Sequence, residues 1–305
     1  MRAETPFFFV VNPTSGLGHR FSGIATRLRR LGVAFSSAAT MGPGDATVLS
    51  SLARHHDFRA IVCVGGDGTL NEVVNGLATP DGRIDDRAVV GIVPSGTAQD
   101  FARGMGIPLT RDDAIDVLLN GRESRIDVGR ITFPDGHIHF FVNVAGAGFD
   151  AEVAEKAAEV RGPAIASIPA HMLGFASALA GYQNKQISIN VEDSPGQATQ
   201  VKCSLLVVAN GPSYAGMMQM APEALVDDGL LDVVVIGDVP TFELLLNLPR
   251  AMTGAHLTHE KVHAYRARAL TIDSSDGALL QADGDVIGRL PARIDVLPGA
   301  LRVLR

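Results

Sequence analysis

Cysteine is scarce in this sequence: Cys63 and Cys203 are its two cysteines among 305 residues. Two isolated cysteines, each in a predicted strand, exclude a disulfide framework and a cysteine-ligated zinc site. Lysine and arginine form no run that suggests a basic arm, and 26 of them stand against 33 acidic residues, for a formal net charge of −7. We therefore expect reduced core cysteines, a cytoplasmic protein and no nucleic acid as its main partner.

Long apolar stretches are also missing. The N-terminal run Phe7–Val11 has five apolar residues and is stopped by Asn12 and Pro13. It is too short for the apolar region of a signal peptide or for a membrane span. Apolar residues nevertheless make up 46% of the chain, which is enough for a substantial core in one large or two medium domains.

Residues 59–77 combine a strand, a glycine turn and a helix start. Arg59–Val64 is rich in apolar β-branched residues and predicts a buried strand, and Gly65–Gly68 makes the turn. Thr69 then opens a helical pattern, and its spacing from Glu72 predicts a capping box. Backbone N–H groups at a helix start point outward and the helix dipole adds positive potential, so the pattern predicts an anion site.

Asp67 lies within this turn. A carboxylate beside a bound phosphate is repulsive unless a cation lies between them, so Asp67 indicates a metal-bound nucleotide. An ordinary strand-to-helix turn is the alternative, in which the glycines serve conformation alone. The run is neither a Walker A loop nor a dinucleotide G-x-G-x-x-G motif.

Other strands of the first 120 residues also end in polar or glycine-containing segments. Predicted strands at 7–11, 33–40 and 88–94 lead to Asn12–Gly16, Thr40 and Ser95–Asp100. Alternating strands and helices predict a doubly wound parallel α/β sheet. Ligands of such sheets bind beyond the carboxyl ends of the strands, so we expect these segments and the glycine turn to meet at one rim.

From Arg125 onward the predicted strands follow one another closely, which indicates an antiparallel β-rich second domain. Pro134–Gly136 predicts a hairpin turn, and helices are expected over residues 151–160 and Ile165–Tyr182. Asp127, a polar residue in an apolar strand, is by itself most simply solvent-facing. Later strands are expected at 186–192, 200–209, 231–236, 267–273, 278–282, 292–296 and 301–304.

The run Gly-Gly-Asp-Gly-Thr-Leu-Asn-Glu at 65–72 resembles the nucleotide-binding signature of the diacylglycerol kinase catalytic family, which includes bacterial lipid kinases and sphingosine and ceramide kinases. NAD kinases and phosphofructokinases are similar more distantly. Nearly the whole chain takes part in the resemblance. Its other motifs are Asn12–Gly16, Gly96–Asp100 with Gln99 where asparagine is usual, Asn210–Leu230, and Asp283–Asp285 with Asp285 where glutamate is usual.

The resemblance implies an N-terminal doubly wound parallel-sheet nucleotide domain followed by an antiparallel β-sandwich domain, with the active site in the interdomain cleft. It also implies that the C-terminal tail returns to the first domain. The expected domains are therefore residues 1–125 with 291–305, which bind nucleotide, and residues 126–290, which bind the lipid substrate.

As a member of this family the chain would use ATP and Mg²⁺. The catalytic Mg²⁺ would be held by Asp67, Asp100 and Asp127, acting through water. Nucleotide contacts are expected at Asn12, Pro13, Thr14, Ser15, Gly16, Thr40, Gly65, Gly66, Asp67, Gly68, Thr69, Leu70, Asn71, Glu72 and Thr97.

The resemblance places the general base at Asp285, with Asp283 as the other candidate; a plain hairpin turn is the alternative for both. It places a second, structural Mg²⁺ at the carboxylate of Asp228 and the backbone carbonyls of Leu225 and Leu230. A turn without an ion is the alternative there.

The implied reaction transfers the γ-phosphoryl group to a hydroxyl of diacylglycerol or a related lipid alcohol. The protein would contact the inner face of the membrane transiently and peripherally, with the apolar helix Ile165–Tyr182 facing lipid. NAD kinase-like transfer to a soluble hydroxyl and a non-catalytic nucleotide-binding regulator are the alternatives. The motifs leave open the lipid, the nucleotide base and a monomeric or homodimeric state.

Overall fold

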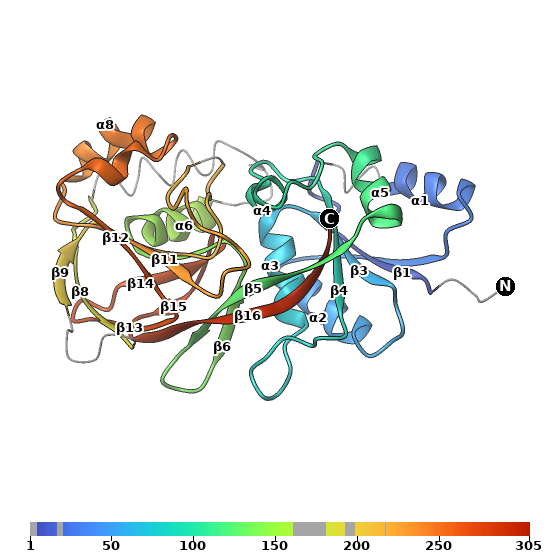
Figure 1. Cartoon of the computed structure of the whole chain (residues 1–305), viewed down its shortest axis with the longest axis horizontal. Helices are drawn as coiled ribbons and strands as arrows, with labels where there is room; N and C mark the ends of the chain where they lie inside the picture. The colour runs from blue at the N-terminus through green and yellow to red at the C-terminus, as the bar shows by residue number, and fades with distance from the viewer. Residues whose placement is uncertain (1–4, 17–20, 161–180, 193–198, 217) are drawn as a thin grey trace. The chain divides into compact units, whose positions relative to one another are not determined.

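The computed structural model describes residues 5–16, 21–160, 181–192, 199–216 and 218–305. The chain forms two compact units, Met1–Val128 with Leu297–Arg305, and Gly129–Val296. Two strands are divided between the units: β5 (Glu123–Thr132) begins in the first and ends in the second, and β16 (Ala292–Leu304) runs the other way. The chain therefore passes twice between units within a strand (Figure 1).

The first unit is built on a parallel sheet. The strand order is β2, β1, β3, β4, and the end of β16 pairs in parallel with β4. Its elements are β1 (Phe7–Val11), α1 (Phe21–Arg30), β2 (Phe35–Ala39), α2 (Asp45–Ala53), β3 (Ala60–Gly65), α3 (Asp67–Gly76), β4 (Val89–Pro94), α4 (Asp100–Gly104) and α5 (Arg111–Asn120). The predicted parallel α/β fold is confirmed.

Both faces of the central strands β3 and β4 are buried, as their unbroken apolar character requires. On one face, Phe9 and Val62 pack with Ile24 and Leu28 of α1 and Ile115 of α5. Side chains alternate along a strand, so the intervening residues face the other side, where α2 contacts β1 and α3 contacts β3. Helix α1 ends at Arg30, and Leu31, the next residue, is 53% exposed.

The second unit contains antiparallel strands in two layers. One layer holds β8 (Lys185–Val191), β9 (Thr199–Cys203), β13 (Ala269–Ser274) and the start of β16, and β5 pairs with β6 (Ile138–Phe141). The other has the order β12 (Val262–Ala267), β11 (Leu231–Ile236), β10 (Leu205–Ala209), β7 (Val144–Gly148), β14 (Leu279–Ala282), β15 (Asp285–Arg289). The helices are α6 (Phe149–Val160), α8 (Thr241–Ala251) and the short η2 (Ala255–Thr258).

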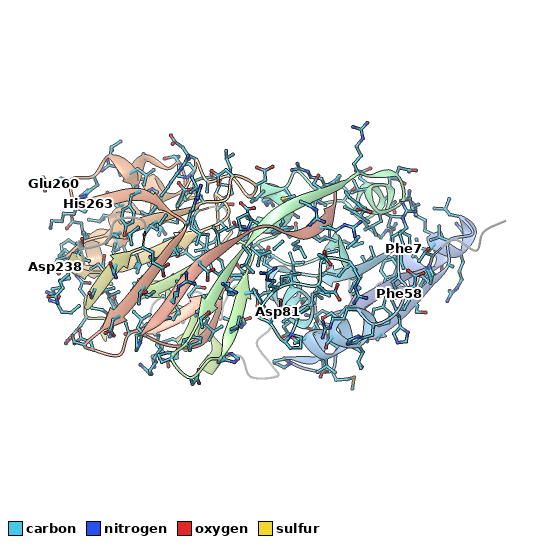
Figure 2. The ribbon with its side chains drawn as sticks, turned by 60° about the horizontal axis from the view of Figure 1, so that its bottom comes forward. Phe7, Phe58, Asp81, Asp238, Glu260 and His263 are labelled. Carbon is cyan, nitrogen blue, oxygen red and sulfur yellow. The ribbon has the colours of Figure 1, made fainter. Side chains whose placement is uncertain are left out.

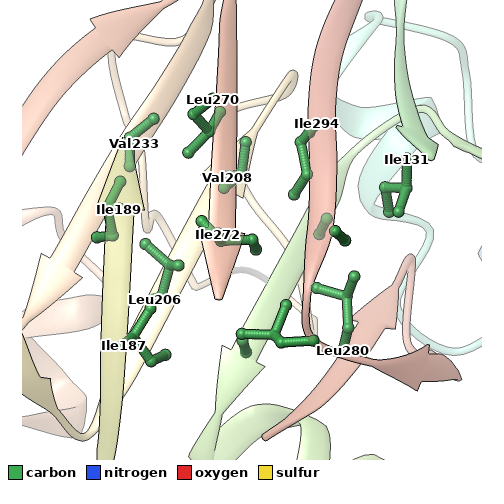
Figure 3. Close-up of a cluster of buried hydrophobic side chains, with 14 of the residues drawn as sticks. Ile131, Ile187, Ile189, Leu206, Val208, Val233, Leu270, Ile272, Leu280 and Ile294 are labelled. Atoms are coloured by element: carbon green, nitrogen blue, oxygen red, sulfur yellow. The ribbon is translucent and has the colours of Figure 1, made fainter. Parts of the chain in front are cut away.

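The core of the second unit lies between these layers. Ile189 and Ile272 of the first layer pack with Leu206, Val208 and other residues of the second in one buried cluster (Figure 3). The polar ends of the strands point outward: Asp238, Glu260 and His263 are exposed (Figure 2). The expected antiparallel β-sandwich is thus present.

One predicted strand is in fact a pair of strands. The stretch 200–209 divides at Ser204, because β9 pairs with β8 in one layer and β10 pairs with β7 and β11 in the other. The fully buried Ser204 hydroxyl lies within hydrogen-bonding distance of the carbonyl oxygens of Ile236 and Gly237, which satisfies it at this corner. The strand predicted at 267–273 is present as β13.

The reverse error occurs at the C-terminus. Strands predicted at 292–296 and 301–304 form one strand, β16, which continues through Pro298 and Gly299. The backbone there is held from the side: Gly299 donates its N–H to the Asp127 carboxylate, and Arg125 donates to the Gly299 carbonyl. Helix α8 and strand β15 were not predicted.

The hairpin at Pro134–Gly136 and the helix at 151–160 are confirmed, since β5 pairs with β6 and α6 covers Phe149–Val160. The expected helix Ile165–Tyr182 lies almost wholly outside the described residues. Within the part of the chain that the structure describes, none of the helices has the length and apolar character to span a bilayer.

Candidate functional site

Three loops of the first unit meet at the carboxyl ends of their strands. Asn12, after β1, donates its side-chain N–H to the Thr69 hydroxyl of α3 at 3.0 Å. Ser15 in the same loop shares a hydrogen bond of 2.7 Å with Ser95, which follows β4. Thr40, after β2, is buried and donates its N–H to the Val11 carbonyl. The loops that the sequence placed at one rim therefore lie together.

Glycine allows this close approach. A Cβ on Gly96 would lie 2.5 Å from the Gly66 Cα, and a Cβ on Gly16 would lie 2.8 Å from the Ser95 carbonyl oxygen. A Cβ on Gly65 would meet the Thr69 side chain at 2.6 Å. These loops pack backbone against backbone, and any larger residue would separate them.

Helix α3 begins at this junction. It starts at Asp67 with extended Gly66 as its N-cap, and no described side chain caps it. The predicted capping box of Thr69 and Glu72 is therefore wrong: Glu72 instead accepts hydrogen bonds from the N–H groups of Gly44 and Ala46 at the start of α2. An N-terminus without a side-chain cap presents its first N–H groups and the positive end of the helix dipole to an anion.

Asp67 connects two of the loops. Its carboxylate accepts hydrogen bonds from the backbone N–H groups of Asp100, at 3.3 Å, and Phe101, at 3.0 Å, at the start of α4. Asp100 is itself buried. The preceding residue, Gln99, has a φ of 56°, a left-handed conformation that asparagine tolerates better than glutamine. Asp67 and Asp100 are thus neighbours in this unit.

Asp127 is buried, at 2% exposure, and accepts the Gly299 N–H at 2.7 Å. The expectation that this residue faces solvent is wrong, because β16 covers it. Within the described residues, no three His, Cys, Asp or Glu side chains form a group that could hold a metal ion directly. Water-mediated ligation by Asp67, Asp100 and Asp127 stays a prediction.

The Asp-Gly-Asp motif forms a hairpin turn in the second unit. Asp283 and Gly284 have φ values of 48° and 97°, and Ala282 pairs with Asp285 across the turn, as in a type I′ hairpin. The Asp283 carboxylate accepts three backbone N–H groups, those of Val142, Asn143 and Val144, at 2.8 to 3.0 Å. Asp285, the first residue of β15, is exposed.

The acidic turn at Asp228 carries a charge partner that the sequence did not reveal. Asp228 accepts the Leu230 N–H at 3.0 Å, and the Arg266 guanidinium lies 4.0 Å from its other carboxylate oxygen. Arg266 also pairs with Asp232 at 3.2 Å. Leu225, the third member of the predicted structural metal site, is exposed. Arg266 thus supplies one positive charge beside the carboxylates of Asp228 and Asp232, and a structural metal ion at this turn stays a prediction.

Neither cysteine belongs to a site. Cys63 in β3 and Cys203 in β9 are free and buried. Burial raises the pKa of the Cys63 thiol, and it raises the pKa of Cys203 to about 12, so both thiols stay protonated at neutral pH. The prediction of reduced core cysteines is confirmed.

Fold and site together define a two-unit protein in which glycine-containing loops of a parallel α/β sheet meet at a helix start without a side-chain cap. Residues 6–131 match the family model described as diacylglycerol kinase catalytic domain, and residues 143–305 match the model described as YegS C-terminal NAD kinase beta sandwich-like domain. The chain belongs to the diacylglycerol kinase family. Membership in a kinase family implies ATP as the phosphate donor.

Known relatives are similar to this protein over most of the chain. A diacylglycerol kinase of Staphylococcus aureus is 30% identical over 294 residues, which cover 93% of this chain and 87% of that protein. A diacylglycerol kinase of Staphylococcus carnosus is 29% identical over 93% of this chain and 89% of its own length. The crystal structure of a diacylglycerol kinase from Bacillus anthracis superimposes with a TM-score of 0.70 at 19% identity, over 99% of this chain and 98% of that chain, which supports the fold.

Proposed function

We propose that this protein is an ATP- and Mg²⁺-dependent lipid kinase that transfers the γ-phosphoryl group to a hydroxyl of diacylglycerol or a related lipid. The observation that carries the proposal is the junction of the loops after β1, β3 and β4 at the uncapped start of α3. Phosphoryl transfer requires mainly positioning and charge stabilisation, and this junction offers backbone donors at a positive helix end.

Carboxylates of the first unit suit magnesium that keeps much of its water shell. Asp67 accepts two backbone N–H groups and Asp127 accepts that of Gly299, and water bound to the ion would likewise donate hydrogen bonds to carboxylates. Asp67, Asp100 and Asp127 would hold the ion in this way. When bound, it would neutralise charge on the phosphates.

Asp285 is the better of the two candidates for the base. Three backbone N–H groups occupy the Asp283 carboxylate, and such hydrogen bonds favour the charged form and lower basicity. Asp285 lies beyond the turn and is exposed. It would orient the acceptor hydroxyl and take its proton as the oxygen–phosphorus bond forms and the bond to ADP breaks.

The proposed substrate class lies in a bilayer. We therefore also propose transient, peripheral contact with a membrane. Such contact needs no spanning helix, since the lipid headgroup carries the reacting hydroxyl at the membrane surface.

Purified protein with ATP and Mg²⁺ would be incubated with mixed micelles containing diacylglycerol, monoacylglycerol, ceramide or sphingosine, and labelled phosphate in the lipid extract would be measured. We expect transfer to at least one of these alcohols. ATP binding without transfer to any of them would contradict the proposal. The Asp285→Asn variant is the control for contaminating kinases.

NAD in place of lipid forms a further arm of this experiment. The match of residues 143–305 to a NAD kinase beta sandwich-like domain favours NAD as the soluble acceptor to test. Formation of NADP with no lipid product would mean that the phosphoryl acceptor is a ribose hydroxyl and not a lipid. Binding of ATP with no product in any arm would indicate a nucleotide-binding regulator.

A further inference from the structure

Gln281 on β14 lies two residues before the turn that carries Asp283 and Asp285. It is 1% exposed, and both ends of its side-chain amide are used. Its Nε2 donates to the Asp150 carboxylate at 2.9 Å, and its Oε1 accepts the Gly284 backbone N–H at 2.9 Å. The amide therefore connects a buried carboxylate to the centre of the turn.

Asp150 lies at the other end of this connection, in the first turn of α6. Its second oxygen accepts the Ala151 N–H at 2.8 Å. Although part of the residue is accessible, its carboxylate is enclosed: a Cβ on Gly146 would lie 1.9 Å from the Asp150 oxygen that contacts Gln281. Gly146 is also the partner of Gln281 in the pairing of β7 with β14, so the missing side chain leaves the space that the carboxylate fills.

The turn is anchored on both of its central residues. Asp283 is held through its carboxylate by the N–H groups of residues 142–144, and Gly284 is held through its N–H by Gln281. Both residues have positive φ, so the turn geometry is tightly defined. Asp285 follows immediately, and its direction depends on these two anchors.

We propose that Gln281 is a positioning residue for Asp285, and that ionised Asp150 fixes the orientation of its amide. This inference rests on the proposed role of Asp285 as the base. A carboxylate can only accept hydrogen bonds, so the Gln281 NH₂ must face Asp150 and the Gln281 oxygen must face Gly284. The reversed amide would set its NH₂ against the Gly284 N–H and release the turn.

Exchanging the two functional groups tests this arrangement. In Gln281→Glu, two carboxylates face each other at the Asp150 contact. In Asp150→Asn, an NH₂ group replaces one of the two oxygens that accept separately from Ala151 and Gln281, so one contact places donor against donor. The double variant Asp150→Asn/Gln281→Glu restores every hydrogen bond, because the asparagine NH₂ donates to the new glutamate, which still accepts the Gly284 N–H.

We expect each single variant to lower kcat for lipid phosphorylation by about tenfold or more, with KM for ATP within about twofold, since a small displacement of a catalytic group costs this much. The double variant should return to within about threefold of wild type. Gln200→Glu, an exposed change of the same kind on β9, is the control for added charge and should leave kcat unchanged.

A second measurement does not depend on activity. Hydrogen exchange at the Gly284 amide should be slow in wild type and in the double variant and faster in both single variants. Two outcomes would overturn the inference while leaving the lipid kinase proposal intact. One is a wild-type kcat in the single variants, and the other is a kcat of the double variant no higher than that of the less active single variant. If wild type phosphorylates no alcohol, that proposal fails instead, and equal exchange of Gly284 in all four proteins would still refute the anchor.

Discussion

At the scale of single residues, neighbouring carboxylates differ in what surrounds them. Asp283 is saturated by three backbone N–H groups, whereas Asp285, two positions along, is exposed. The same hairpin turn therefore combines a carboxylate that organises the backbone with one that is exposed to solvent. The sequence motif shows only that both residues are acidic, whereas the hydrogen bonds to Asp283 distinguish its role from that of Asp285.

Replacing each of these aspartates by asparagine should give opposite results. Asp285→Asn should lower kcat about a hundredfold or more, the usual size for loss of a general base, with unchanged stability. Asp283→Asn places an NH₂ against one backbone N–H, and we expect a loss of about 1–3 kcal/mol in the free energy of unfolding. Lipid phosphorylation assays and urea unfolding curves measure the two effects.

Wild-type turnover in Asp285→Asn would move the role of base to Asp283. Unchanged stability in Asp283→Asn would mean that its three hydrogen bonds contribute little to the turn. Asp81→Asn, an exposed change in the first unit, is the matched control for loss of one carboxylate.

Asp150 should make stability depend on pH. Burial raises its pKa to about 6, with hydrogen bonds from Gln281 and Ala151 opposing the shift. Between pH ~4 and 6 the folded state then binds more protons than the unfolded state, so stability from this group falls as pH rises through about 6, by up to about 3 kcal/mol. Urea unfolding of wild type and Asp150→Asn at several pH values should show this difference.

Other ionisable groups near Asp150 are separable from it. Burial raises the pKa of Tyr182 and raises that of Cys203 to about 12, so neither titrates in this window. Among the side chains that the structure describes, the other charged ones on α6 and on β15, which contacts it, are Glu152, Glu155, Lys156, Asp285 and Arg289, and Glu152 pairs with Lys185. A stability difference that stays constant from pH 4 to 7 would contradict the assignment to Asp150.

At the scale of elements, the glycine turn and the loop after β4 are in close contact, and in the proposed kinase this contact would shape the nucleotide site. Gly96→Ala should separate these loops, because its Cβ would lie 2.5 Å from the Gly66 Cα, and backbone cannot move aside cheaply. We expect ATP affinity to fall by about tenfold or more, on the order of 1.4 kcal/mol. Isothermal titration with ATP and Mg²⁺ measures it.

Gly42→Ala is the matched control, since a Cβ there meets nothing within 4 Å and its φ is not positive. Equal ATP affinity of the two variants would mean that the contact between Gly66 and Gly96 does not shape the nucleotide site.

The predictability of these elements follows from the range of the forces involved. Strand–turn–helix units such as 59–77 carry local signals, an apolar run followed by glycines, and they were predicted. The division at Ser204 carries no local signal, because apolar residues continue through it and the change of layer is decided by pairing partners distant in sequence. The spacing of Glu72 from Thr69 matched a capping box, yet its carboxylate accepts hydrogen bonds from the N–H groups at the start of α2, a contact that the sequence could not show.

The same holds for the candidate site. Motifs identified Asp67, Asp283 and Asp285 together with their loops, since spacing and residue type are visible in one dimension. Gln281 and Arg266 were missed because no motif contains them. Gln281 contacts Asp150, 131 positions away, and Arg266 contacts Asp228, 38 positions away, and these contacts give the two residues their importance. Burial of Asp127 depends on β16, 172 positions along the chain.

At the scale of the whole molecule, the first unit depends on the last residues of the chain. Leu301 and Val303 on β16 are fully buried, and β16 pairs with β4 through Arg302 and Val303. Leu301→Ala should lower the free energy of unfolding by about 2–5 kcal/mol through lost burial and a cavity. The unfolding transition should be followed by a probe in the first unit, such as ATP binding.

The same replacement at an exposed position supplies the control. Leu31, also in the first unit, is 53% exposed, and Leu31→Ala should change stability by no more than about 0.5 kcal/mol. Equal effects at the two positions would contradict the contribution of the terminal strand to the first unit.

The division of β16 between the units also has a consequence for biosynthesis. On the ribosome, residues 1–128 emerge first, but the parallel partner of β4 is translated only after residues 129–296. The edge of the nascent sheet at β4 therefore stays unpaired while residues 129–296 are synthesised, and an unpaired edge strand can pair with other chains. The second unit has every residue it needs earlier, so the usual order, in which the N-terminal half of a protein completes its structure first, is reversed here.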